Sequence, residues 1–175
     1  MKTNGDVEYP KVAASTVEKV VYTVTIVSVI IFILFLGWSL SQLPSEVPIH
    51  RSFSGEITYG SPVSFIFLPI IAIATSLFLF GSRFLVSLFN FPVEVTDGNI
   101  RILIILTRNM IAHMALVTTA IFFAIYIEAL FITNEQPMLG IAATVVWMKI
   151  VIIYYFVKII KKGKAYREGS AEEDG

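Results

Sequence analysis

Long apolar blocks alternate with short polar segments along the chain. No charged residue occurs from position 20 to 45 or from 57 to 82, so each of these intervals is 26 residues long. An α-helix needs about 20 consecutive apolar residues to cross the hydrocarbon core of a bilayer. Each interval is therefore predicted to hold one membrane-spanning helix.

Two further apolar blocks carry isolated polar residues. The block at 111–132 contains His113 and Glu128, and the block at 138–157 contains Lys149. Both blocks are still long enough to span a membrane as helices. Backbone groups that face lipid must be hydrogen-bonded within their own segment, and no block alternates with the period of two that barrel strands show. The sequence therefore predicts an all-α, integral membrane four-helix bundle.

The element boundaries follow from the same pattern. We expect an N-terminal segment, a membrane domain with four spans, an ordered loop between the first two spans, a helix that starts before the third span, and a disordered tail. The N-terminal segment is at 1–19, the membrane domain at 20–160 with spans at about 20–41, 63–88, 111–132 and 138–158, the loop at 42–62, the helix start at about 97–110, and the tail at 161–175.

The helix of the third span is predicted to extend beyond the membrane. Thr96 is a candidate N-cap, and Asp97 suits the first helical turn. A helix from there to position 132 would be about 54 Å long, whereas the hydrocarbon core is about 30 Å thick. We therefore expect its first part to lie at the membrane surface, with Arg101 and Arg108 among the lipid headgroups.

The basic residues indicate how the chain is oriented. Lysines and arginines precede the first span, follow the fourth, and lie between the second and the third, whereas the loop at 42–62 holds one, Arg51. Because cytoplasmic segments carry an excess of Lys and Arg, both termini are predicted to be cytoplasmic and the loop extracellular. The tail changes from basic to acidic, a composition that cannot bury a core, and this is why we expect disorder there.

The composition excludes several classes of function. The chain is 56% hydrophobic and contains no cysteine, so disulfides and thiolate ligands are excluded. It has no Gly-rich phosphate-binding loop, no HExxH or GxSxG motif, and no basic patch interleaved with aromatic residues. We therefore expect a protein that is not an enzyme and that takes no cofactor, no metal and no nucleic acid.

The loop at 42–62 has the composition of an ordered segment. Pro44 and Pro48 favour an extended path away from the first span, and Gly55 and Gly60 supply the backbone freedom that tight turns need. Tyr59 is one of several apolar or aromatic residues between these positions. Such side chains are suited to cover the outer end of the bundle.

His50, Glu46 and Glu56 are the chemically versatile side chains of this loop. A neutral imidazole binds metals or changes its charge near pH about 6.5, and it also holds turns by bonding a carbonyl group. A metal site needs several converging ligands. We hypothesise that His50 and Glu56 form part of a recognition surface for a peptide or a partner protein. A membrane enzyme that uses His50 with Glu46 or Glu56 stays open as a further reading.

Lys149 and Glu128 are the polar residues predicted to lie within the membrane. Lys149 lies about 17 Å into the fourth span, near the bilayer centre, where a charge costs at least about 2.5 to 3.5 kcal/mol on translocon scales. Glu128 lies only about 6 Å below the outer end of the third span. A small transporter or proton-coupled component that uses this pair is the alternative function, and a structural lysine fits the sequence equally well.

The loop also carries the pattern of a known family. Its matching residues, in order, are Leu43, Pro44, Val47, Pro48, His50, Gly55, Tyr59, Gly60 and Ser61. Together with FNFPVEVTDGN at 89–99, this pattern resembles the domain-of-unknown-function 1648 family, which includes immunity proteins against the sporulation-delay toxin. The resemblance covers about residues 20 to 132.

The resemblance implies a small bacterial plasma-membrane protein of the immunity or signalling type. Its expected partners are the lipid bilayer and, through the extracellular loop, a toxic peptide or a membrane signalling protein. The oligomeric state stays open.

Overall fold

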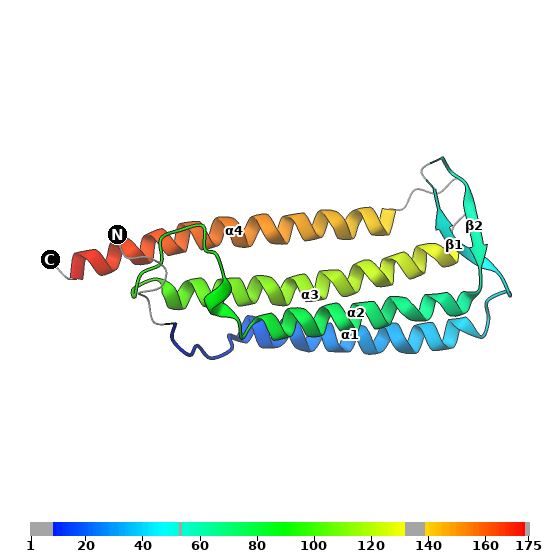
Figure 1. The fold of residues 1–175 in the computed structure, drawn as a ribbon, viewed down its shortest axis with the longest axis horizontal. Coiled ribbons are helices and arrows are strands. Elements are labelled where there is room, and N and C mark those ends of the chain that lie inside the picture. The colour runs from blue at the N-terminus through cyan, green and yellow to red at the C-terminus, as the bar shows by residue number, and fades with distance from the viewer. Residues whose placement is uncertain (1–8, 53, 132–138, 174–175) are drawn as a thin grey trace.

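One helix, α3, lies at the centre of the fold and contacts the other three helices (Figure 1). In the computed structural model, residues 9–52, 54–131 and 139–173 are described. Within these residues, α1 and α2 pack extensively on α3 but only sparsely on each other, and α4 has α3 as its only extensive helical neighbour. The helices are α1 (Thr16–Leu40), α2 (Phe67–Ser82), α3 (Ile100–Phe131) and α4 (Leu139–Glu173).

The predicted all-α class is confirmed, as are four helices of membrane-spanning length. The apolar helical segments are Thr16–Leu40, Pro62–Ser82, Ile100–Leu130 and Leu139–Tyr166. In α1, α2 and α4 the exposed side chains far outnumber the buried ones, which matches helices whose surroundings are lipid. The chain is therefore a multi-pass membrane protein. The four helices do not contribute equally to the bundle, because α4 packs extensively on α3 alone.

Small side chains let the neighbouring helices approach α3 closely. Ala112 and Ala115 are fully buried, and so is Val117, two residues after Ala115. Lipid tails are as apolar as the side chains, so helix association in membranes depends on close packing and on hydrogen bonds. One such bond joins the hydroxyl groups of Ser76 in α2 and Thr119 in α3, which lie 3.3 Å apart.

α4 contacts α3 through a narrow stripe. Val151, Tyr155, Ile159 and Gly163 are buried at intervals of four residues, whereas most other side chains of α4 are exposed. Residues four apart lie on one face of an α-helix. The stripe therefore gives α4 one protein-facing side.

The structure moves two of the predicted boundaries. α2 ends at Ser82, six residues before the predicted end of the second span, and α3 begins at Ile100. The hydroxyl of Thr96 is buried without a hydrogen-bond partner, so Thr96 is not the expected N-cap. Instead, Oδ1 of Asn99 accepts the Thr96 amide at 2.8 Å, which closes the turn before the helix.

The connection between α2 and α3 folds back over the beginning of α3. It contains a short 3-10 helix, η2 (Val86–Leu88), followed by an irregular stretch. Phe91 and Val95 are buried there against Leu103 of α3 and Ile159 of α4. This packing explains why the chain leaves the helical path after Ser82.

The predicted disorder of the tail at 161–175 is wrong for most of that segment, because α4 continues to Glu173. Lysine, alanine and glutamate are good helix formers. Extending an existing helix also avoids the unfavourable nucleation step. The composition of the tail, taken by itself, does not show that the tail continues a helix that has already formed.

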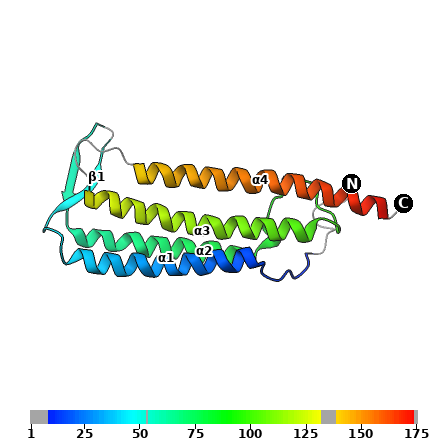
Figure 2. The same cartoon turned by 180° about the vertical axis from the view of Figure 1, so that it is seen from behind.

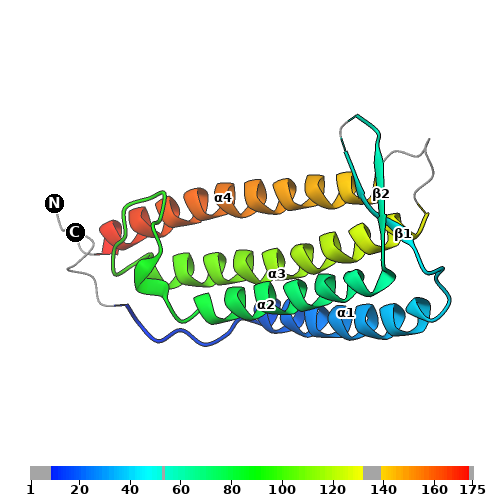
Figure 3. The same cartoon turned by 45° about the vertical axis from the view of Figure 1, so that its right-hand side comes forward.

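The loop between α1 and α2 contains an antiparallel hairpin, where only an ordered loop was predicted. Its strands are β1 (Val47–Arg51) and β2 (Ile57–Gly60), and a 3-10 helix, η1 (Pro62–Ile66), leads into α2. The hairpin lies at the end of the helices opposite the α2–α3 connection and the last turns of α4 (Figure 1, and Figure 2 from behind). Seen obliquely, it projects across the helix ends (Figure 3).

Gly163 provides a test of the contact between α3 and α4. A Cβ atom at this position would lie 2.8 Å from Cγ2 of Val93 and 3.0 Å from Cδ2 of Leu103. We expect Gly163→Leu to lower the free energy of unfolding by about 1 to 3 kcal/mol through overpacking. Thermal unfolding in detergent micelles, followed by circular dichroism, measures the change.

Gly37 supplies the matched control, because a Cβ atom there would meet nothing within 4 Å. Gly37→Leu is expected to leave the stability nearly unchanged. Equal losses for the two variants would contradict a specific contact at Gly163.

Candidate functional site

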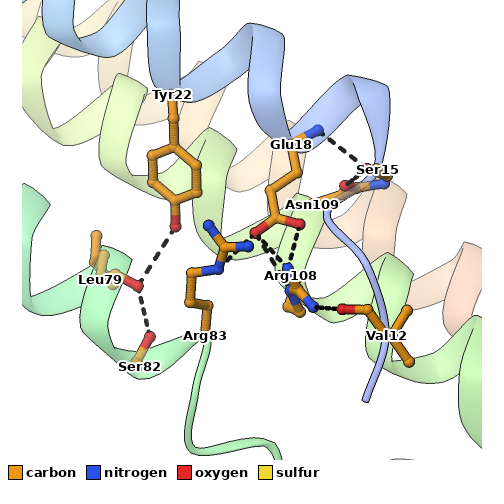
Figure 4. Close-up of polar contacts among 9 residues, drawn as sticks. All are labelled: Val12, Ser15, Glu18, Tyr22, Leu79, Ser82, Arg83, Arg108 and Asn109. Carbon is orange, nitrogen blue, oxygen red and sulfur yellow. Dashed lines mark hydrogen bonds and ion pairs between the residues drawn. The ribbon is translucent and has the colours of Figure 1, made fainter. Parts of the chain in front are cut away.

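A buried ionic cluster joins α1, the end of α2 and α3 (Figure 4). It consists of Glu18, Arg83 and Arg108, and we call it the Glu18 cluster. Oε2 of Glu18 lies 2.9 Å from Nη2 of Arg108, and its Oε1 lies 3.1 Å from Nε of Arg83. The Glu18 side chain is 2% exposed. These contacts fix three helices at one end of the molecule.

Hydrogen bonds from neighbouring residues complete the Glu18 cluster. Arg108 donates from Nη1 to the carbonyl oxygen of Val12 at 2.7 Å, and Ser15 donates from Oγ to Oδ1 of Asn109 at 2.5 Å. The segment before α1 is thereby attached to α3. Buried charges are tolerated when partners of opposite sign and hydrogen bonds replace water, and both are present here.

Arg83 is the most accessible member of the Glu18 cluster. Its side chain is 16% exposed, compared with 7% for Arg108. The Arg83 guanidinium lies over the rings of Phe80 and Phe84, at 5.1 and 5.2 Å from their centroids. Although its Nε is close to Glu18, the N–H group has no hydrogen-bond partner. Arg83 is therefore held by ion pairing and by aromatic faces, with less directional bonding than Arg108.

The formal charges of the Glu18 cluster do not cancel. Two guanidinium groups face one carboxylate, which leaves a net charge of one positive unit. An uncompensated positive charge near the membrane boundary attracts anions, and the attraction is stronger where water is excluded.

Glu18 was not predicted as a site residue, and the predicted position of Arg108 is wrong. Arg108 was expected among the headgroups, but it is 6% exposed and paired with Glu18. The signal for Glu18 was the tetrad Ser15-Thr16-Val17-Glu18, a capping-box pattern directly before an apolar run. Half of that box forms, since Ser15 Oγ accepts the Glu18 amide at 3.1 Å. The Glu18 carboxylate instead binds the arginines.

The hairpin is attached to the opposite end of the bundle by an apolar anchor. Val47 is 3% exposed and belongs to a buried group with Phe32, Phe65 and Tyr126. The Tyr126 ring is fully buried, and its hydroxyl bonds that of Ser39 in α1. The start of β1 is therefore fixed against aromatic side chains of three helical elements.

The outer part of the hairpin is open. Tyr59 is 58% exposed and Ile49 is 42% exposed. The strand register pairs Pro48 with Tyr59 and His50 with Thr58, and an irregularity at Ile49 separates these pairs. Gly60 allows Ile49 to lie close, because a Cβ atom there would be 2.6 Å from Cδ1 of Ile49.

The predicted loop residues have different structural roles. Gly55 has a φ of 90°, which favours glycine, and its amide donates to the Ser52 carbonyl at 3.0 Å within the turn. Pro44, Glu46 and Glu56 are exposed, and Pro48 is half-buried. The backbone of His50 lies in β1, but its side chain is outside the described part of the structure. The hypothesis that His50 and Glu56 act together stays a prediction.

Glu128, near the end of α3, contacts the first turn of α4. Its Oε1 accepts the amide of Ile141 at 3.0 Å and also that of Gly140. The first amides of a helix lack partners within the helix, and a carboxylate there is favoured by the helix dipole. Glu128 therefore anchors the start of α4 to α3.

The structure does not bring Lys149 and Glu128 together. Lys149 lies nine residues beyond Gly140 on α4, about 13 Å along the axis, and its side chain is exposed. Within the described residues, neither the Lys149 nor the Glu128 side chain takes part in the ion pairs of the Glu18 cluster. No group of three or more His, Asp or Glu side chains suited to a metal ion occurs in that part of the chain.

His113 of α3 contacts Tyr155 of α4. Its Nδ1 lies 3.1 Å from the hydroxyl of Tyr155 and 2.8 Å from the carbonyl oxygen of Asn109. This side chain is half-buried and links the two helices.

Comparison of the chain with protein families, with curated proteins and with solved structures finds no match. The resemblance carried by the loop pattern therefore stays a prediction.

Removing the Glu18 carboxylate tests whether the cluster stabilises the fold. Glu18→Gln leaves two buried cations without their counter-ion, and we expect the free energy of unfolding to fall by about 3 to 5 kcal/mol. Unfolding in detergent micelles measures the loss. Glu46→Gln removes the same charge from an exposed position and is expected to change stability by about 0.5 kcal/mol or less.

A double variant separates the ion pair from a general packing effect. The losses of Glu18→Gln and Arg108→Gln are expected to be less than additive when combined, because the two side chains contact each other. Additive losses would contradict the assigned interaction.

Lys149 tests how α4 lies in the membrane. If its exposed amine is surrounded by lipid, Lys149→Met should favour insertion of α4 by about 2 to 3 kcal/mol, and Lys149→Arg should not. A glycosylation-reporter assay of membrane insertion compares the variants. Equal insertion of Lys149→Met and the native sequence would show that the lysine is not held within the hydrocarbon.

Proposed function

We propose that the protein recognises a polypeptide at the bacterial cell surface through its hairpin, as an immunity or signalling protein of the plasma membrane. The single observation that carries this proposal is the asymmetric burial of the hairpin. Val47 is 3% exposed against the bundle, whereas Tyr59 is 58% exposed on the free side. A pre-organised surface loses little conformational entropy when it binds.

The chemistry of the hairpin suits a peptide ligand. Each strand has one hydrogen-bonded neighbour among the described residues, so each offers a free edge. An extended segment adds to such an edge through main-chain hydrogen bonds. Tyr59 supplies an aromatic anchor of the kind that is enriched at binding hot spots. The ligand is either a toxic peptide or an extended segment of a membrane partner.

The distribution of charges supports an extracellular position for the hairpin. Most of the basic residues lie at one end of the molecule, in and before the first turn of α1, in the α2–α3 connection, in the first part of α3 and in the last turns of α4, and the hairpin lies at the other end (Figure 1). By the positive-inside tendency, both termini are on the cytoplasmic side.

Transport is less well supported by the geometry. Glu128 is engaged with the first amides of α4, and Lys149 is exposed on the same helix. A proton or ion pathway that uses both groups would need their side chains to line the same channel. An enzyme that uses Glu46 or Glu56 would need a sheltered cleft, and both carboxylates are exposed.

Site-specific photo-crosslinking in native membranes tests the proposed function. A photoreactive residue in place of Tyr59 is expected to capture a defined peptide or protein segment, which mass spectrometry of the adduct identifies. The matched control places the same residue at Phe78, which is 73% exposed on α2, within a predicted span. Phe78 should yield lipid adducts instead.

The captured polypeptide must also depend on the hairpin surface. With the segment then made synthetically, Tyr59→Ala is expected to weaken its binding about tenfold or more, and Glu46→Gln much less. Normal membrane abundance without a polypeptide adduct at position 59, or binding unaffected by Tyr59→Ala, would refute the proposal.

A further inference from the structure

α1 and α2 enclose an apolar groove of about 300 Å³ on the outside of the bundle. Its walls include Ile26 and Ile30 of α1, and Leu77 and Phe80 of α2. These four side chains are between 40% and 64% exposed, so the groove is open to the surroundings of the helices. It exists because α1 and α2 both pack on α3 and scarcely touch each other.

The groove is nearly as long as one lipid leaflet is thick. On α1 it extends from Tyr22 to Ile30, a stretch of nine residues that rises about 12 Å along the axis. Half of a hydrocarbon core of about 30 Å is about 15 Å. The groove occupies the half of α1 and α2 that is nearer the Glu18 cluster.

The end of the groove is positively charged. Phe80 lines the groove, and its ring carries the Arg83 guanidinium at 5.1 Å. Tyr22 closes the same end, with its hydroxyl 3.5 Å from the Leu79 carbonyl oxygen (Figure 4). Glu18 is the only ion-pair partner of Arg83 among the described residues, and it is shared with Arg108. An apolar channel one leaflet long thus ends beside an incompletely neutralised arginine.

We propose that the groove between α1 and α2 binds one acyl chain of an anionic phospholipid whose phosphate lies beside Arg83. Apolar walls alone would accept any lipid. The surplus charge of the Glu18 cluster selects a headgroup with a net negative charge, because the phosphate neutralises what the single carboxylate does not. The lipid then completes the packing between two helices that lack contacts of their own.

Native mass spectrometry of the full-length protein tests this proposal. The protein is released from bilayers of phosphatidylglycerol and phosphatidylcholine with identical acyl chains, so the two lipids differ only in the headgroup, which is anionic in the first and zwitterionic in the second. We expect one retained lipid with a preference of about fivefold or more for phosphatidylglycerol, since one basic residue near a membrane surface contributes about 1 kcal/mol.

Variants separate the charge from the groove. Arg83→Gln should abolish the preference, and Arg83→Lys should keep most of it. Lys19→Gln is the control, because this exposed lysine lies at the same end of α1 and does not line the groove. Leu77→Trp fills the groove without touching the Glu18 cluster and should reduce the retention of both lipids.

Several outcomes would overturn the proposal. These are equal retention of the two lipids by the native protein, a preference that survives Arg83→Gln in folded protein, or displacement of the lipid by inorganic phosphate alone. A dimer that Leu77→Trp dissociates would also overturn it, since a second copy of the chain would then occupy the groove.

Discussion

The carboxylate of Glu18 is the interaction on which the arrangement of the first three helices depends. It is almost completely buried and forms ion pairs with Arg108 on α3 and with Arg83 at the end of α2. Removing such charges from water is costly, and the cost is offset only when all partners are in place. The starts of α1 and α3 and the end of α2 are therefore placed together. The surplus positive charge also distinguishes this end of the molecule chemically.

The opposite end is held by apolar contacts. Aromatic rings of α1, η1 and α3 surround Tyr126, and Val47 of the hairpin packs among them. α1 and α2 are thus each fixed at both ends through α3, with little direct contact in between. The groove follows from this geometry, as does the rigid base of the hairpin. α4 lines neither the groove nor the base of the hairpin, and it packs on α3 through its own buried stripe.

The sequence predicted the class of fold and the number of spans, because uninterrupted apolar blocks leave few alternatives in a membrane. It did not predict what depends on contacts between distant segments. The partner of Arg108 is 90 positions away at Glu18, so spacing along α3 suggested a surface residue. The hairpin was missed because Pro48 and the irregularity at Ile49 hide the alternation of its strands. Of the loop residues singled out, the glycines have clear backbone roles, whereas the recognition role of His50 and Glu56 rests on the sequence alone.

Charged groups near the membrane divide here into two kinds. Glu18 is paired with two arginines, and one carboxylate oxygen of Glu128 accepts the first amides of α4, so both side chains act as links between helices. Arg83 is only partly satisfied, and Lys149 is exposed on a helix of membrane-spanning length. Because unpaired charge in a low-dielectric region is unfavourable, the second kind marks where the chain meets lipid headgroups, water or another molecule. Stability therefore depends on the first kind, and contacts with the surroundings depend on the second.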